Sequence, residues 1–205
     1  MGSTDRPSRV SVRRNTRGGN SGRLPSHYRR LCALRSVESA IEFECKRKPG
    51  VETGGVLVGF IDESKDAVVV VSASGPGPRA LHRSHRFNRD AVFCQAWLDE
   101  WVRESDGRLD FVGEWHSHPE THPTPSSVDV GTFTRLAANP ACHLDRLALL
   151  IAGTRAGGRW RARDQLTRVN GWSVRADGVA ERVVEWLPDE AYTEFLGPPA
   201  TREVP

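Results

Sequence analysis

The run of four valines at positions 68–71 most constrains the fold of this chain. Consecutive β-branched residues favour an extended strand, and a strand without polar alternation is typically covered on both faces. No segment approaches the roughly 18 uninterrupted apolar residues that cross a bilayer. We therefore expect a soluble protein whose central strand lies in a sheet that is covered by helices.

The flanking sequence supplies further strands and a first helix. Apolar residues recur at helical spacing over 36–48, where Pro49 and Gly50 end the pattern. The segment 52–62 predicts a strand that forms a hairpin with the valine strand, and the prolines and glycines of 75–78 predict a loop. A return strand over 81–87 is a weaker expectation.

The second half of the chain repeats this mixture. Asn88 is a candidate N-cap of a helix that ends near Ser105. A strand over 109–118 is followed by a helix that starts at Ser126 or Ser127 and ends at 139–140. The segment 146–153 predicts an apolar strand and 160–169 an exposed edge strand. Helices and strands alternate irregularly, which predicts an α/β (α+β) fold with a mixed sheet between helices.

The positive charge of the chain is concentrated at its start. The formal net charge is +3, yet residues 1–25 contain six arginines and one aspartate, so the remaining 180 residues carry −2. This first segment is too polar and too rich in glycine and serine to build a core, and we expect a disordered Arg-rich tail. A basic tail on an acidic body does not favour nucleic-acid binding. No secretory signal is recognisable, so we expect a cytoplasmic location without membrane attachment.

The four cysteines, Cys32, Cys45, Cys94 and Cys142, include no CxxC pair. This spacing argues against a zinc knuckle or a thioredoxin-type site. Three of them lie in apolar surroundings, and we interpret them as small buried residues.

His116 and His118 stand at alternate positions of the predicted strand 109–118, so both side chains project from one face. Asp129 follows after a proline-rich loop and could supply a third ligand. Two histidines and one carboxylate, with a fourth position left for water, make a typical catalytic zinc set. An HxH pair by itself is more often ordinary polar alternation on an exposed strand, and the added aspartate changes that balance.

Ser126 and Asp129 have a second interpretation that involves no chemistry. The pattern S-x-x-D is a capping box at a helix start, and it occurs in many helices without a catalytic role. Both interpretations can hold together, because a cap that fixes the first helical turn also directs Asp129 back toward the end of the histidine strand.

H-x-H followed by seven residues and then S-x-x-D resembles the JAMM motif of the JAB1/MPN/Mov34 metallopeptidases. That family also has a glutamate upstream, before a glycine-rich apolar strand, and Glu52 in ETGGVLVG stands at the matching place. The resemblance covers roughly residues 30–155. It implies a cytidine-deaminase-like JAB/MPN three-layer fold, with a catalytic domain over 26–165 and a C-terminal extension over 166–205 that packs on the domain or trails it.

Carried over by residue, the resemblance implies one Zn²⁺ ion bound by His116, His118, Asp129 and a water molecule. It also implies Glu52 as general acid and base, and Ser126 as a hydrogen-bond donor to the tetrahedral intermediate. An elevated pKa would suit Glu52 to this role, and the apolar strand beside it could provide the necessary desolvation. The family does not use His122, and His82 and His85 are expected to face substrate or solvent.

The resemblance further implies cleavage after the C-terminal tail of a ubiquitin-like protein, in deconjugation or in precursor processing. It points to bacterial members associated with ubiquitin-like, including antiphage, pathways, whose E1-like and E2-like enzymes are then possible partners. Two alternatives stay open: a peptidase that acts on an adduct of a small sulfur-carrier protein, and a non-catalytic MPN scaffold. The complete set of motif residues counts against the scaffold.

Overall fold

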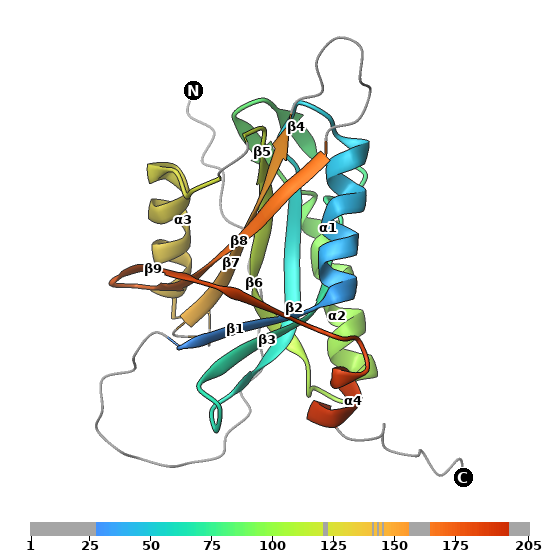
Figure 1. Cartoon of the computed structure of the whole chain (residues 1–205), viewed down its shortest axis with the longest axis vertical. Helices are drawn as coiled ribbons and strands as arrows, with labels where there is room; N and C mark the ends of the chain where they lie inside the picture. Colours follow the sequence, from blue (N-terminus) through green and yellow to red (C-terminus); the bar gives the residue numbers. More distant parts are fainter. Residues whose placement is uncertain are drawn as a thin grey trace.

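The computed structural model describes residues 28–120, 123–140, 142, 144, 146–155 and 165–196. An eight-stranded mixed sheet, ordered β10-β1-β3-β2-β6-β7-β8-β9, organises this part of the chain. In Figure 1, α3 lies to one side of the sheet and α1 and α2 lie to the other. The predicted combination of a mixed sheet with flanking helices is thereby confirmed. The predicted tail over 1–25 lies outside the described residues.

The first half of the fold follows the sequence patterns closely. Strand β1 (Arg30–Leu34) leads into α1 (Arg35–Arg47), and β2 (Gly54–Asp62) pairs antiparallel with β3 (Ala67–Ala73). The valines 68–71 of β3 are at most 5% exposed, so the expected burial on both faces is confirmed. The strand lies between β1 and β2 in the sheet.

The segment after β3 differs from the prediction of one return strand. Two short strands, β4 (Leu81–Arg83) and β5 (Arg86–Asn88), form a hairpin that is separate from the main sheet. Asn88 therefore ends a strand, and Asp90 is the N-cap of α2 (Ala91–Glu104). The predicted cap at Asn88 was wrong because the extended backbone of β5 continues through it, and the N-cap lies two residues later at Asp90.

The remaining elements complete the sheet. Strand β6 (Asp110–His118) is followed by α3 (Ser127–Ala137) and by β7 (Arg146–Arg155), which runs parallel to β6. Strand β8 (Gln165–Arg175) pairs with β7 and with β9 (Gly178–Arg182). Strand β9 pairs with β8 at residues 171–175, whereas residues 165–169 pair with β7 alone, so the predicted edge position is confirmed over 165–169 of the described chain. Residues 160–164 lie outside the described part.

The C-terminal elements join opposite edges of the sheet. Val183 alone separates β9 from β10 (Val184–Leu187), which pairs parallel with β1 at the other edge and precedes α4 (Ala191–Leu196). A Cβ atom added at Gly171 of β8 would collide with side chains of Leu31 and Val184, so the sheet curls until β8 approaches β1 and β10. The boundary predicted between residues 165 and 166 falls inside β8. No helix of the described residues is long and apolar enough to cross a membrane.

Candidate metal centre

Strand β6 positions the two histidines of the HxH pair. His116 pairs with Gly54 of β2, and His118 pairs with Gly153 of β7. The two residues are 8% and 9% exposed, whereas Trp115, which precedes His116, is 1% exposed and donates its indole N–H to the carbonyl of Ser74. Strand alternation therefore separates the core tryptophan from the two imidazoles, as the sequence pattern predicts.

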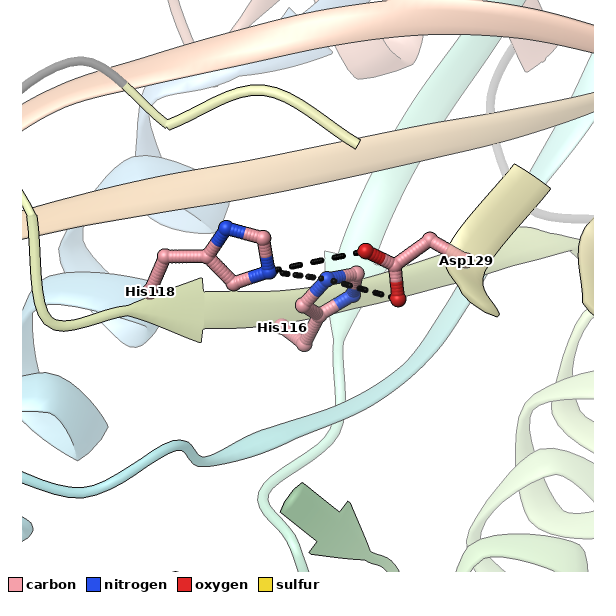
Figure 2. Close-up of side chains that lie close together, drawn as sticks. All are labelled: His116, His118 and Asp129. Atoms are coloured by element: carbon pink, nitrogen blue, oxygen red, sulfur yellow. Dashed lines mark hydrogen bonds and ion pairs between the residues drawn. The ribbon is translucent and has the colours of Figure 1, made fainter. Parts of the chain in front are cut away.

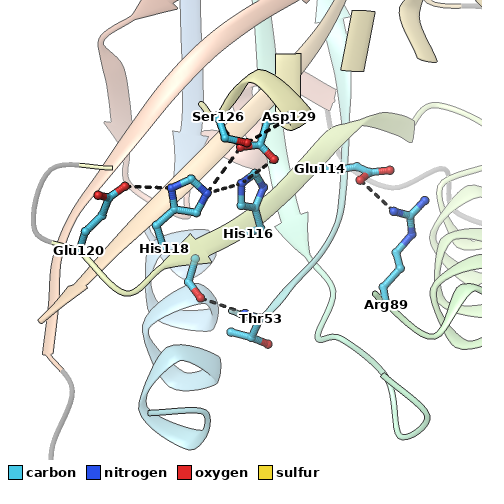
Figure 3. Close-up of polar contacts among 9 residues, drawn as sticks. Thr53, Arg89, Glu114, His116, His118, Glu120, Ser126 and Asp129 are labelled. Atoms are coloured by element: carbon cyan, nitrogen blue, oxygen red, sulfur yellow. Dashed lines mark hydrogen bonds and ion pairs between the residues drawn. The ribbon is translucent and has the colours of Figure 1, made fainter. Parts of the chain in front are cut away.

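The N-terminus of α3 positions Asp129. Ser126 is the N-cap, and its Oγ accepts a hydrogen bond from the backbone N–H of Asp129 at 3.2 Å. The Oδ2 atom of Asp129 accepts one in return from the backbone N–H of Ser126 at 2.7 Å. The capping box is thus formed, and it holds the carboxylate over the end of β6 (Figure 3).

The cap and the strand bring three donor groups together (Figure 2). The Nε2 atoms of His116 and His118 are 3.0 Å apart. Oδ1 of Asp129 lies 3.4 Å from Nε2 of His116, and Oδ2 lies 3.6 Å from Nε2 of His118. The predicted ligand residues are therefore adjacent in space, and one atom of each lies within 4.8 Å of the others.

These separations fit a shared metal ion. Two ligand atoms at about 2.05 Å from a tetrahedrally coordinated zinc ion lie about 3.3 Å apart. The Nε2–Nε2 separation of 3.0 Å, and the separations of 3.4 and 3.6 Å from these nitrogens to the Oδ1 and Oδ2 atoms of Asp129, lie around that value. The donor set of two imidazoles and one carboxylate therefore suits a metal ion and leaves room for a ligand that does not come from these three residues.

Glu120 is a residue of this centre that the sequence reasoning missed. Its Oε1 lies 3.1 Å from Nδ1 of His118 (Figure 3). A carboxylate can only accept this hydrogen bond, so the proton of His118 belongs on Nδ1 and the lone pair of Nε2 faces the cluster. A carboxylate behind a ligand histidine is a common second contact in metal sites. The alternating spacing His116, His118, Glu120 was the available signal.

The carboxylates also set the electrostatics of the cluster. Burial favours the neutral form of His118, but hydrogen bonds with Asp129 and Glu120 outweigh it and raise the pKa of that imidazole. Burial would likewise raise the pKa of Asp129, but the two imidazoles and Ser126 lower it well below the usual range. Protons and a metal ion compete for the same imidazole nitrogens, so metal affinity should fall as the pH falls.

Glu52 reaches the neighbourhood of the cluster from the segment before β2. The next residue, Thr53, is fixed by Ser117 in both directions: its N–H donates to the Ser117 hydroxyl at 3.0 Å, and its carbonyl accepts from the Ser117 N–H at 2.7 Å. Glu52 is half-buried, and its desolvation raises the pKa of its carboxyl group despite the opposing effect of His118 and His116. The pKa of the predicted proton acceptor therefore depends on the charges of the predicted ligand histidines.

Ser126 is exposed at the start of α3. In the capping box its Oγ serves as an acceptor, which uses a lone pair and leaves the hydroxyl proton available. The cap and the predicted donor role are therefore compatible.

Strand β6 also carries a carboxylate, Glu114, two residues before His116. Glu114 accepts a hydrogen bond from Arg89 at 2.8 Å, so its charge is paired (Figure 3). Arg89 also lines a mainly apolar groove of about 410 Å³ between α2, β2 and β6. None of the five predicted site residues is among the residues that line this groove.

Comparison with known proteins finds similar sequences over much of the chain. The profile of the prokaryotic homologs of the JAB domain matches residues 34–165. A protein from Enterobacter hormaechei named CD-NTase/cGAS isopeptidase is 30% identical over 153 residues, which are 74% of this chain and 81% of that protein. A probable metalloprotease from Sinorhizobium fredii is 28% identical over 118 residues, covering 57% of this chain and 71% of that protein.

The fold also has a solved counterpart. The solution structure of a protein from Desulfitobacterium hafniense superposes with a TM-score of 0.53 at 20% identity. The superposition covers 78% of this chain and 96% of that one. At this level of identity the similarity concerns the fold alone.

Proposed function

This chain belongs to the prokaryotic homologues of the JAB domain, a family of metallopeptidases, and from that premise we propose that it is a zinc-dependent isopeptidase. Its substrate is a conjugate or precursor in which an amide bond follows the C-terminal tail of a ubiquitin-like protein. The observation that carries the proposal is the convergence of two imidazoles and one carboxylate next to the half-buried Glu52.

We propose zinc as the metal because the donor set suits a transition metal and the composition is one that catalytic zinc sites use. Imidazole nitrogens suit zinc, copper, iron and nickel, whereas magnesium and calcium prefer oxygen ligands. Three protein ligands with one anionic member are the usual composition of a catalytic zinc site. When bound, such an ion lowers the pKa of a water molecule and polarises the carbonyl of the scissile amide.

The residues around the ion have separate tasks. Glu52 accepts a proton from the attacking water as the new C–O bond forms, and delivers it to the amide nitrogen as the C–N bond breaks. A raised pKa suits this double task, because the carboxyl group must both accept and release the proton. The free hydroxyl proton of Ser126 donates to the carbonyl oxygen as negative charge develops there. Glu120 keeps Nε2 of His118 unprotonated.

The relatives suggest which pathway the substrate belongs to. Several similar proteins are named CD-NTase/cGAS isopeptidase, and we propose that this chain releases a ubiquitin-like protein from a CD-NTase of its own cell. E1-like and E2-like enzymes that make such a conjugate are its expected functional partners, in a pathway of antiviral defence. The β4–β5 hairpin offers strand edges near Glu52 on which an extended tail could add as a further strand.

A cleavage assay with a fusion of the candidate modifier to a reporter protein tests the proposal. The zinc-loaded enzyme should release the reporter at the end of the modifier tail, a chelator should stop the reaction, and added zinc should restore it. Glu52→Gln should keep the zinc and lose cleavage, whereas Glu100→Gln on the exposed face of α2 should behave as wild type. Cleavage that survives chelation, or full activity of Glu52→Gln, would overturn the proposal.

A further inference from the structure

The β4–β5 hairpin contacts the main domain at the backbone of Glu52. The N–H of Glu52 donates to the carbonyl of Arg83 at 2.8 Å. The carbonyl oxygen of Glu52 lies 3.0 Å from Nδ1 of His82. Both backbone polar groups of the predicted proton acceptor are therefore held by two consecutive residues of this hairpin.

The contact with His82 defines a tautomer. A carbonyl oxygen can only accept a hydrogen bond, so Nδ1 of His82 must carry the proton that it donates to Glu52. His82 is half-buried, and its ring lies against that of Phe87 with centroids 5.4 Å apart and planes inclined by 34°. The imidazole is thus held in place by a ring on one side and by a hydrogen bond at its edge.

Phe87 connects the hairpin to the strand that carries the ligands. A Cβ atom added at Gly54 would lie 2.9 Å from Cε1 of Phe87, so the aromatic ring rests directly on the backbone of β2. Gly54 in turn pairs with His116. The ring therefore packs at the place where β2 meets the histidine strand, and only a residue without a side chain leaves room for it.

The Glu52 side chain has no anchor of its own. Its carboxylate forms no hydrogen bond or ion pair with the residues that the structure describes. Thr53 is fixed by Ser117, but Glu52 precedes the first strand residue, Gly54, and among the described residues the partners of its backbone N–H and carbonyl belong to the hairpin. The direction in which the carboxylate points therefore depends on the two hairpin contacts.

We propose that His82 is a positioning residue that orients Glu52 through the hydrogen bond to its backbone carbonyl. This role rests on the proposed function of Glu52 as proton acceptor. His82 does not touch the substrate bond or the metal in this role, and it acts by limiting the rotation of the segment 51–53. Proton transfer depends steeply on geometry, so a loosened Glu52 should slow the chemical step and leave substrate binding nearly unchanged.

Two substitutions separate the hydrogen bond from the packing. His82→Phe keeps a ring against Phe87 and removes the donor. His82→Asn places an amide N–H at the position of Nδ1 and removes the ring. Glu100→Gln, on the exposed face of α2 and outside the hairpin, controls for general disturbance. We expect His82→Phe to lower kcat about tenfold with KM changed less than twofold, and His82→Asn to recover kcat to within about threefold of wild type.

Zinc content and hydrogen exchange provide readouts that do not need turnover. Zinc content should equal wild type in all variants, and the amides of 51–53 should exchange faster in His82→Phe than in His82→Asn. Wild type and Glu52→Gln in the same assay report on the proposed function itself, and exchange still tests the contact if neither cleaves. Unchanged kcat and exchange in His82→Phe, no recovery in His82→Asn, or loss of zinc in both would overturn the proposal.

Discussion

Helices α2 and α3 both begin with an aspartate that accepts hydrogen bonds from backbone N–H groups, as the N-cap of α2 and as the third residue of α3, yet only α3 begins at the candidate metal centre. At α2 the carboxylate of Asp90 accepts hydrogen bonds from the backbone N–H groups of Phe93 at 3.2 Å and Arg79 at 3.1 Å. At α3 the carboxylate of Asp129 accepts one from the backbone N–H of Ser126 at 2.7 Å. Each acid is a helix-start residue that satisfies backbone donors.

The two carboxylates differ in the partner of the oxygen atom that is not hydrogen-bonded to the N–H of the helix start. Both oxygens of Asp90 serve backbone N–H groups, and Arg79 stands nearby at 3.7 Å. Oδ1 of Asp129 instead faces Nε2 of His116. A capping carboxylate therefore becomes a candidate ligand only where a strand brings imidazoles to the same helix start. The comparison can be tested with matched substitutions at both helices.

Asp129→Asn should have the largest effect, because it removes the only anionic member of the donor set while an amide of the same shape remains. We expect zinc to be lost and cleavage to fall about 10³-fold or more, since a catalytic metal supplies several kcal/mol of transition-state stabilisation. Metal analysis and steady-state kinetics measure both. Asp90→Asn is the matched control and should keep zinc and activity. Equal behaviour of the two variants would contradict the distinction between the helices.

Ser126→Ala should have an intermediate effect that combines both roles of the α3 cap. Loss of one donor to the developing oxyanion lowers kcat by about 10²–10³-fold, and loss of the cap lowers the free energy of unfolding by about 1 kcal/mol. Ser126→Thr keeps both functions and should recover most of each. If Ser126→Ala lowered the thermal stability but not kcat, the Ser126 hydroxyl would serve only as a helix cap, as the carboxylate of Asp90 does.

The raised pKa of Glu52 should affect both the pH dependence of kcat/KM and the stability of the fold, in contrast to Glu114, whose charge is paired with Arg89. Glu52 must be ionised to accept a proton, and burial raises the pKa of its carboxyl group, so kcat/KM should fall at a higher pH than an exposed glutamate would require, about tenfold per pH unit below the limb. For stability the sign is opposite: a raised folded-state pKa means that the ionised form destabilises the fold at neutral pH.

Glu52→Gln should therefore leave the melting temperature of the metal-free protein equal to or above that of wild type at pH 7. Glu114→Gln should lower it, because the substitution leaves the half-buried Arg89 without its partner. A lower melting temperature for Glu52→Gln would show that the ionised Glu52 carboxylate stabilises the fold, which contradicts a destabilised catalytic carboxylate.

Asp90→Ala should have the smallest effect and should affect stability alone. We expect the free energy of unfolding to fall by about 1 kcal/mol, within the range for loss of an N-cap. Denaturant unfolding measures this change, and kcat/KM at a temperature well below the transition should stay within twofold of wild type. A clear loss of activity in the folded variant would mean that the start of α2 contributes to the site as well.

Much of the local structure could be predicted because it depends on short-range patterns. The helical spacing of Val37, Ile41 and Cys45 predicts α1, and all three are buried. The valines 68–71 predict a covered strand, and the S-x-x-D pattern predicts the start of α3. Each pattern lies within one element, so its physical cause is contained in the neighbouring residues.

The errors arose where a distant segment decides the environment. The edge position of β8 over 165–169 was predicted, whereas the pairing of its residues 171–175 with β9 was not. Asn88 and Asp90 both have side chains that can cap a helix. Because β5 extends through Asn88, the N-cap of α2 is Asp90. Nothing in the sequence near His82 indicates its contact with Glu52, 30 positions away. Glu120 is different, because it lies two residues from His118 and its alternating spacing was an available signal.

The sequence by itself determined the parts of the site that one strand and one helix start contain: two histidines on the same face, and a capping box that turns Asp129 backward. Only the tertiary structure decided that these groups meet, with Nε2 atoms 3.0 Å apart, and that Glu52 stands beside them under the hold of a separate hairpin. The physical reason is the distance along the sequence over which each effect acts. Backbone periodicity and capping act over a few residues, whereas donor convergence and desolvation depend on segments that only the folded sheet brings together.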